Sequence, residues 1–170
     1  MVKNSPQPAL KPVGDSMFYM WRCIIVMAHA DGVIHKSERE FFEKVFANMA
    51  RAYTLTKDQA DTFARDLESP QDIDQLLPNV ADTEFRSLLL YFSQIVAWID
   101  GDLSPHEANL LKKLHSSRGD GSEQIMADIR QQMASQVVRR REDGEKQILR
   151  HPLYYALDAL LDRLGIPPID

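Results

Sequence analysis

Apolar residues recur at three- and four-residue intervals along most of the chain, which is the spacing of one face of an α-helix. The first such run follows Asp15 or Ser16 and predicts a largely buried helix that is stopped by Gly32. The next run predicts a helix over residues 36–53. The core positions expected in these two helices are Met17, Met20, Trp21, Ile24, Ile25 and Ala28, then Phe41, Phe42, Val45, Phe46 and Met49.

Capping residues and prolines predict the boundaries of the next two helices. Thr56 and Gln59 have the spacing of a capping box, so a third helix should begin at this point. Its expected apolar stripe consists of Ala60, Phe63, Ala64 and Leu67. Ser69 followed by Pro70 closes that helix and predicts a short fourth one that runs to about Leu77.

The second half of the chain continues the helical pattern. Asp82 or Thr83 should cap a fifth helix, and Ser104-Pro105 should open a sixth that runs to about His115. The apolar face of the fifth helix consists of Phe85, Leu88, Leu89, Phe92, Ile95, Val96 and Ile99. Further helices are expected over about residues 122–141 and 152–164, and no segment alternates at period two for long enough to predict a strand. The expected fold class is therefore all-α, with about seven or eight helices in a single domain.

Three regions follow from this pattern. Residues 1–14 are rich in proline and should form an irregular lead-in, residues 15–141 should form the helical domain, and residues 142–170 should form a C-terminal helical extension. The leucine stripe of the last helix has two interpretations, since it would suit either the chain's own core or a second subunit. A homo-oligomer is therefore one open alternative.

Two acidic turns, 69 residues apart, give the chain an internal repeat. Asp31-Gly32-Val33-Ile34 with Glu38, and Asp100-Gly101-Asp102-Leu103 with Glu107, both fit the pattern Asp-Gly-x-aliphatic-x-x-x-Glu. Each turn lies between two apolar helical segments, so a helix-turn-helix unit occurs twice. We expect the two units to be pseudo-symmetric and to pack about a twofold axis, which would bring the turns to related positions.

The turns resemble the second half of a calcium-binding EF-hand loop, but the first half does not fit. The positions that would carry the first two ligands are Met27 and His29 in one copy and Val96 and Trp98 in the other. None of these residues supplies a carboxylate, so an ordinary EF-hand is excluded. A purely structural role explains much of the pattern, because the glycines end helices and Glu107 has capping-box spacing from Ser104.

A metal site is the alternative to that structural role. Convergence of the turns would gather up to five carboxylates, which repel one another unless they face water or hold a cation. Oxygen ligands favour calcium or magnesium, and zinc becomes an option if His29, His35 or His106 joins the site. The candidate metal ligands are Asp31, Glu38, Asp100, Asp102 and Glu107.

The amino-acid composition of the chain argues against several kinds of function and location. The chain has 170 residues, a net charge of −5 and a pI near 5.5, which argues against a nucleic-acid partner. The longest apolar stretch, residues 17–30, is too short and too polar to span a bilayer, so no direct membrane insertion is expected. The single cysteine, Cys23, should be a buried side chain, and with no signal peptide in view a cytoplasmic location is expected.

Motifs for catalysis are absent from the sequence. No glycine-rich phosphate loop, Gly-x-Ser-x-Gly or His-Glu-x-x-His occurs, and His29 is expected to be a hydrogen-bonded, half-buried histidine. The chain is therefore not expected to be an enzyme. A metal-dependent hydrolase that uses the clustered carboxylates to activate water is retained as an alternative.

The two turns in register resemble the TerB-like domain of tellurite-resistance proteins, which also precedes the J domain of a membrane-bound co-chaperone. The resemblance covers about residues 16–115 and rests on residues 28–34, residues 97–105, Glu38 and Glu107. It implies an all-helical, non-enzymatic module that is acidic on one surface, is associated with tellurite or other chemical stress, and is proposed to bind metal ions. The sequence departs from the family at His35 and in the extension after about Asp143. The resulting expectation is a helical module that binds an unidentified protein partner.

Overall fold

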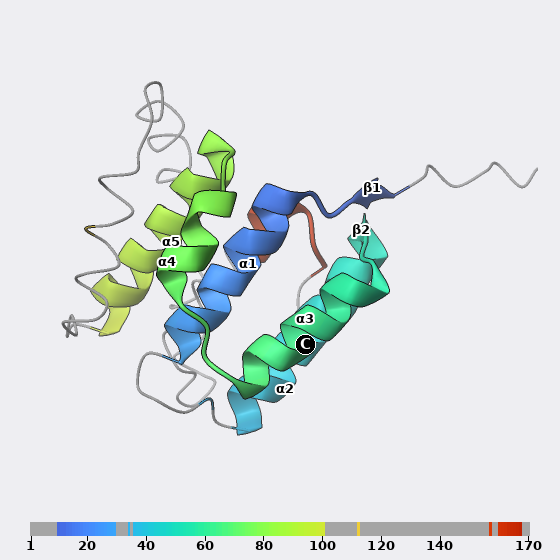
Figure 1. Cartoon of the computed structure of the whole chain (residues 1–170), viewed down its shortest axis with the longest axis horizontal. Helices are drawn as coiled ribbons and strands as arrows, with labels where there is room; N and C mark the ends of the chain where they lie inside the picture. Colours follow the sequence, from blue (N-terminus) through green and yellow to red (C-terminus); the bar gives the residue numbers. More distant parts are fainter. Residues whose placement is uncertain are drawn as a thin grey trace, which may run out of the picture.

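The described part of the chain is mostly helical (Figure 1). The computed structural model describes residues 10–29, 34, 36–100, 112, 157 and 160–167, without the side chains of residues 37 and 94–100. The helical character expected from the sequence is confirmed for these residues. Of the helix expected over residues 105–115, Lys112 is described and is helical, and the helix expected over residues 122–141 lies outside the described residues. The elements are β1 (Lys11–Pro12), α1 (Asp15–Ala28), α2 (Lys36–Ala52), β2 (Tyr53–Thr54), α3 (Lys57–Glu68), α4 (Ile73–Leu76), the 3-10 turn η1 (Leu77–Asn79) and α5 (Thr83–Asp100).

Helix α1 lies at the centre of the described fold. It contacts α3, α4, η1 and α5, and Figure 1 shows it between the α2–α3 pair and the α4–α5 pair. Most of the circumference of α1 is buried, although Phe18, Tyr19 and Arg22 are only half-buried, and each fully buried large apolar side chain contributes ~1.5–3 kcal/mol. The expected core positions of this helix are all confirmed as buried, and Cys23, Val26 and Met27 are buried as well. The helix ends at Ala28, with His29 as its C-cap, earlier than its sequence pattern predicts.

Aromatic rings join α2 and α3 to α1. The rings of Phe46 and Phe63 stack with their centroids 4.3 Å apart and their planes 10° apart. Trp21 of α1 meets Phe46 edge-on at 6.2 Å. Of the expected core stripe of α2, Phe42 and Phe46 are buried with Val45 and Met49, whereas Phe41 is partly buried. Such ring pairs contribute about 0.5–1.5 kcal/mol beyond their buried area.

The buried face of α3 differs from the predicted stripe. Phe63 and Leu67 are buried as expected, but Ala60 and Ala64 are exposed, and Asp66 is buried in their place. The helix is rotated so that Asp66 faces α1, where its carboxylate accepts a hydrogen bond from Arg22. The two alanines consequently fall at the opposite, solvent-facing edge. Assigning them to the core was wrong because a period-based stripe counts apolar residues only.

Strands β1 and β2, of two residues each, form a small parallel sheet that the sequence pattern did not predict. Lys11 pairs with Tyr53 and Pro12 with Thr54. The main-chain nitrogen of Val13 then donates to the oxygen of Thr54 at 3.1 Å, and the Val13 side chain is buried. The end of the expected irregular lead-in is therefore ordered against the residues that follow α2.

The short fourth helix begins later than predicted. Ser69 has an extended backbone and is the C-cap of α3, in accord with the preference of residues before proline for extended conformations. Asp72 caps α4 instead, because its carboxylate accepts a hydrogen bond from the main-chain nitrogen of Asp74 at 2.9 Å. Aspartate is a strong N-cap residue, so the start at Ser69-Pro70 is corrected to Asp72.

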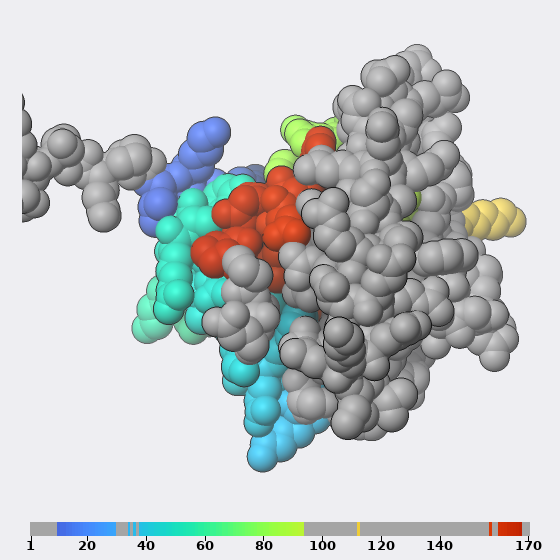
Figure 2. Space-filling view, turned by 180° about the vertical axis from the view of Figure 1, so that it is seen from behind, coloured from blue at the N-terminus to red at the C-terminus, as the bar shows by residue number. Residues whose placement is uncertain are grey.

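The C-terminal segment, which we define as Leu157 with residues 160–167, covers the rear of the molecule. Leu157, Leu160 and Leu161 are completely buried and belong to the same core as α1. Figure 2 shows the segment, coloured red, against the cyan and turquoise residues of α2 and β2. In the structure, these leucines therefore cover the chain's own core.

Gly165 ends this last helix, as the sequence predicts. Its φ of 71° is in the left-handed region that favours glycine. The main-chain nitrogens of Ile166 and Gly165 donate to the oxygens of Leu161 at 2.9 Å and Asp162 at 3.2 Å. These two bonds form a Schellman motif, with Ile166 buried beside the helix.

Candidate functional site

The structure describes only part of the candidate metal site. The side chain of Glu38 lies in the first turn of α2 and is buried, with 4% of the residue exposed. Asp100 is the last residue of α5, and its side chain is outside the described residues. Asp31, Asp102 and Glu107 also lie outside the described residues. The proposed gathering of these carboxylates therefore stays a prediction, as do the contributions of His35 and His106.

Ile34, the aliphatic residue of the first turn, is buried. It is 8% exposed and belongs to the main hydrophobic core. The first acidic turn is therefore attached to the core by this side chain.

His29 is hydrogen-bonded, as expected from the sequence, and it is buried rather than half-buried. Its Nε2 lies 2.8 Å from the main-chain oxygen of Asp66. Because a carbonyl oxygen only accepts, Nε2 carries the proton and donates it. Nε2 is thus occupied within the protein, and only Nδ1 would be free to ligate a metal ion.

Cys23 is an inert core side chain. It is completely buried in α1, and burial raises the pKa of its thiol to about 12. Since the thiolate is the nucleophilic form of cysteine, this residue supplies no nucleophile near neutral pH. The sequence prediction for Cys23 is confirmed.

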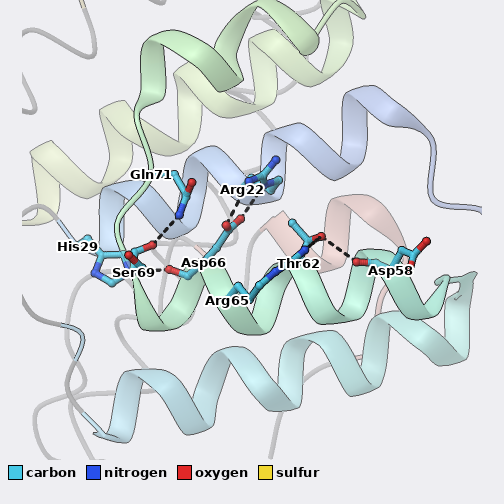
Figure 3. Close-up of polar contacts among 8 residues, drawn as sticks. All are labelled: Arg22, His29, Asp58, Thr62, Arg65, Asp66, Ser69 and Gln71. Carbon is cyan, nitrogen blue, oxygen red and sulfur yellow. Dashed lines mark hydrogen bonds and ion pairs between the residues drawn. The ribbon is translucent and has the colours of Figure 1, made fainter.

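The most ordered polar arrangement of the described residues is an ion pair between α1 and α3 (Figure 3). Arg22 donates from Nε to Oδ2 of Asp66 at 2.7 Å and from its terminal nitrogen to Oδ1 at 3.2 Å. Asp66 is 2% exposed and Arg22 is 15% exposed. A two-point contact of this kind is stronger and more directional than a single hydrogen bond.

Two aromatic rings complete the surroundings of Arg22. Its guanidinium carbon lies 5.7 Å from the centroid of Phe18 and 5.5 Å from that of Tyr19. The hydrogen bond that Arg22 donates to Asp66 raises the pKa of Arg22 above its already high usual value, so the guanidinium stays charged. All five donors of the guanidinium are fixed in one plane, and two of its nitrogens bond the carboxylate of Asp66.

The sequence contains an indication of this ion pair, which is overlooked when only apolar residues are assigned to the core. Asp66 interrupts the stripe formed by Phe63 and Leu67, and Arg22 interrupts the apolar run of α1. Charged residues are almost never buried unless they are paired. One acidic and one basic residue, each within an apolar stretch, therefore indicate an ion pair between Asp66 and Arg22.

Helices α1 and α5 lie side by side and run in the same direction (Figure 1). Near their starts, the hydroxyl oxygen of Ser16 accepts a hydrogen bond from the main-chain nitrogen of Asp82 at 3.0 Å. Near their ends, Oγ of Ser93 lies 3.4 Å from the sulfur of Met27. Both pairs are 66 residues apart in the sequence, so the register between the helices is constant. The C-terminal ends of α1 and α5, which lead into the acidic turns, consequently lie at the same end of the molecule.

The described residues contain neither a cluster of metal-binding side chains nor a helix suited to a membrane. No group of three His, Cys, Asp or Glu side chains within the described ranges lies close enough together to hold a metal ion. Across those same ranges, no helix combines the length and the apolar character needed to cross a bilayer.

Comparison with known proteins gives no relative. No protein-family model, curated protein or solved structure matches the chain. The similarity to TerB-like domains thus rests on the two acidic turns and their spacing.

Proposed function

We propose that this protein is a non-enzymatic, TerB-like helical module that binds a partner protein and holds a divalent cation weakly where its two acidic turns meet. The observation that carries the proposal is the parallel register of α1 and α5. Two helices that run side by side in one direction deliver the segments that follow them to the same end of the molecule.

The register also makes a meeting of the turns geometrically feasible. Asp100 follows Ser93 by seven residues of helix, or about 10 Å along the axis. Asp31 follows Met27, the contact partner of Ser93, by four residues. Because α1 ends at Ala28, at most three residues of extended chain, about 10 Å, lead from the end of the helix to Asp31, which is sufficient to reach the level of Asp100.

The ligand chemistry favours a hard cation. The candidate ligands Asp31, Glu38, Asp100, Asp102 and Glu107 offer carboxylate oxygens, which suit calcium or magnesium. Zinc prefers nitrogen or sulfur ligands, and Nε2 of His29 is already bonded to Asp66. We therefore expect calcium or magnesium to bind in preference to zinc.

Calorimetric titration of the chelator-treated protein tests this proposal. Calcium, magnesium, manganese and zinc are each titrated into the wild type and into the Asp31→Ala and Asp100→Ala variants. Binding to the wild type that is lost in both variants would support the proposal. Heat no larger than that of dilution with all four ions would overturn the metal site.

A matched control separates a specific site from general acidity. Asp61 is an exposed residue of α3 and belongs to neither of the two turns. The Asp61→Ala variant removes the same charge and should bind the ion as the wild type does. Circular dichroism of all three variants verifies that they remain folded.

A purely structural or oligomerising domain without a metal is the second candidate. It is favoured by the burial of Glu38, since a carboxylate in the first turn of a helix stabilises the partial positive charge of the helix N-terminus. Under this alternative, Glu38→Gln lowers the free energy of unfolding equally with and without added cation.

A further inference from the structure

No further inference is drawn: the strongest candidate, the patch on the surface of α1 where the half-buried side chains of Phe18, Tyr19 and Arg22 lie together, carries none, because the guanidinium already binds Asp66 and nothing in the structure shows what else covers the two rings.

Discussion

Asp66 of α3 binds Arg22 of α1 through both carboxylate oxygens, and its main-chain oxygen accepts a further hydrogen bond from His29. Arg22 and His29 are seven residues apart, which places them on one face of α1, two turns from each other. A single residue therefore holds α3 to α1 at two levels. The contact is specific because only this alignment of the helices satisfies all three bonds.

Removal of one partner of this ion pair should destabilise the protein. Asp66→Asn keeps the shape of the side chain but leaves the largely buried guanidinium of Arg22 without its counter-charge. We expect the free energy of unfolding to fall by about 2 kcal/mol, since partial exposure of Arg22 lets water offset some of the loss. Urea denaturation followed by circular dichroism measures the change.

Two comparisons make that prediction specific. The double variant Arg22→Met with Asp66→Leu should recover part of the loss, because it leaves no unpaired buried charge. Glu68→Gln breaks the ion pair between Arg39 and Glu68, which is exposed, and should cost less than about 1 kcal/mol. Equal losses for Asp66→Asn and Glu68→Gln would contradict the importance assigned to the buried pair.

Cys23 should make stability depend on alkaline pH. Burial raises the pKa of its thiol to about 12, whereas a thiol in an unfolded chain has a pKa of about 8.5. The unfolded state thus releases the proton first, so this contribution is fully present below about pH 8.5 and declines as the pH rises. Between about pH 7.5 and pH 9.5, the wild type should lose about 1 kcal/mol more than Cys23→Ala does. Parallel losses in the two proteins would show that the thiol is not protected.

Ser87 allows the cost of a buried hydroxyl group without a hydrogen-bond partner to be measured. Its hydroxyl is buried and has no hydrogen-bond partner in the part of the chain that the structure describes. Ser93, on the same helix, donates to the main-chain oxygen of Leu89 at 2.8 Å. We expect Ser87→Ala to be neutral or to stabilise the protein by up to about 1 kcal/mol, and Ser93→Ala to be the less stable of the two variants. Thermal unfolding of both variants checks their order.

Gly165 should be difficult to replace, although there is room for a side chain. No atom lies within 4 Å of the position that a Cβ would occupy, so any cost comes from the backbone φ of 71°. Gly165→Ala should therefore lose about 1–2 kcal/mol of stability. Gly14→Ala is the control, since its φ of −72° suits any residue and the site is equally open. A similar loss at both positions would show that backbone strain is not the cause.

Local sequence rules predicted the features that depend on neighbouring residues. The capping box of Thr56 and Gln59 forms as expected, with both reciprocal hydrogen bonds present. The stop at Gly165 and the burial of α1 were equally clear from the sequence. Each of these features is determined within one or two turns of helix, where spacing and residue type carry the necessary information.

Features that depend on distant partners were missed. The inward orientation of Asp66 requires Arg22, which is 44 residues away, and the pairing of β1 with β2 joins segments on either side of two helices. The choice between Ser69 and Asp72 as the cap of α4 depends on how the chain leaves α3. The periodic spacing of apolar residues does not encode such relationships. The charges of Arg22 and Asp66 within apolar stretches were nevertheless an indication that these two residues pair.

The C-terminal segment also has a consequence for the order of folding. Tyr53 is hydrogen-bonded to Leu164, which is 111 residues away, and Asn48 to Pro167, which is 119 residues away. Contacts between residues so distant in sequence are slow to form, because a large loop must close before they provide any stabilisation. During synthesis, α1 to α5 can assemble while the leucines that cover their rear face have not yet been made. The apolar surface beneath Leu160 and Leu161 then lacks the cover of these side chains until residues 160–167 emerge, so the core is completed only after the C-terminal segment has been made.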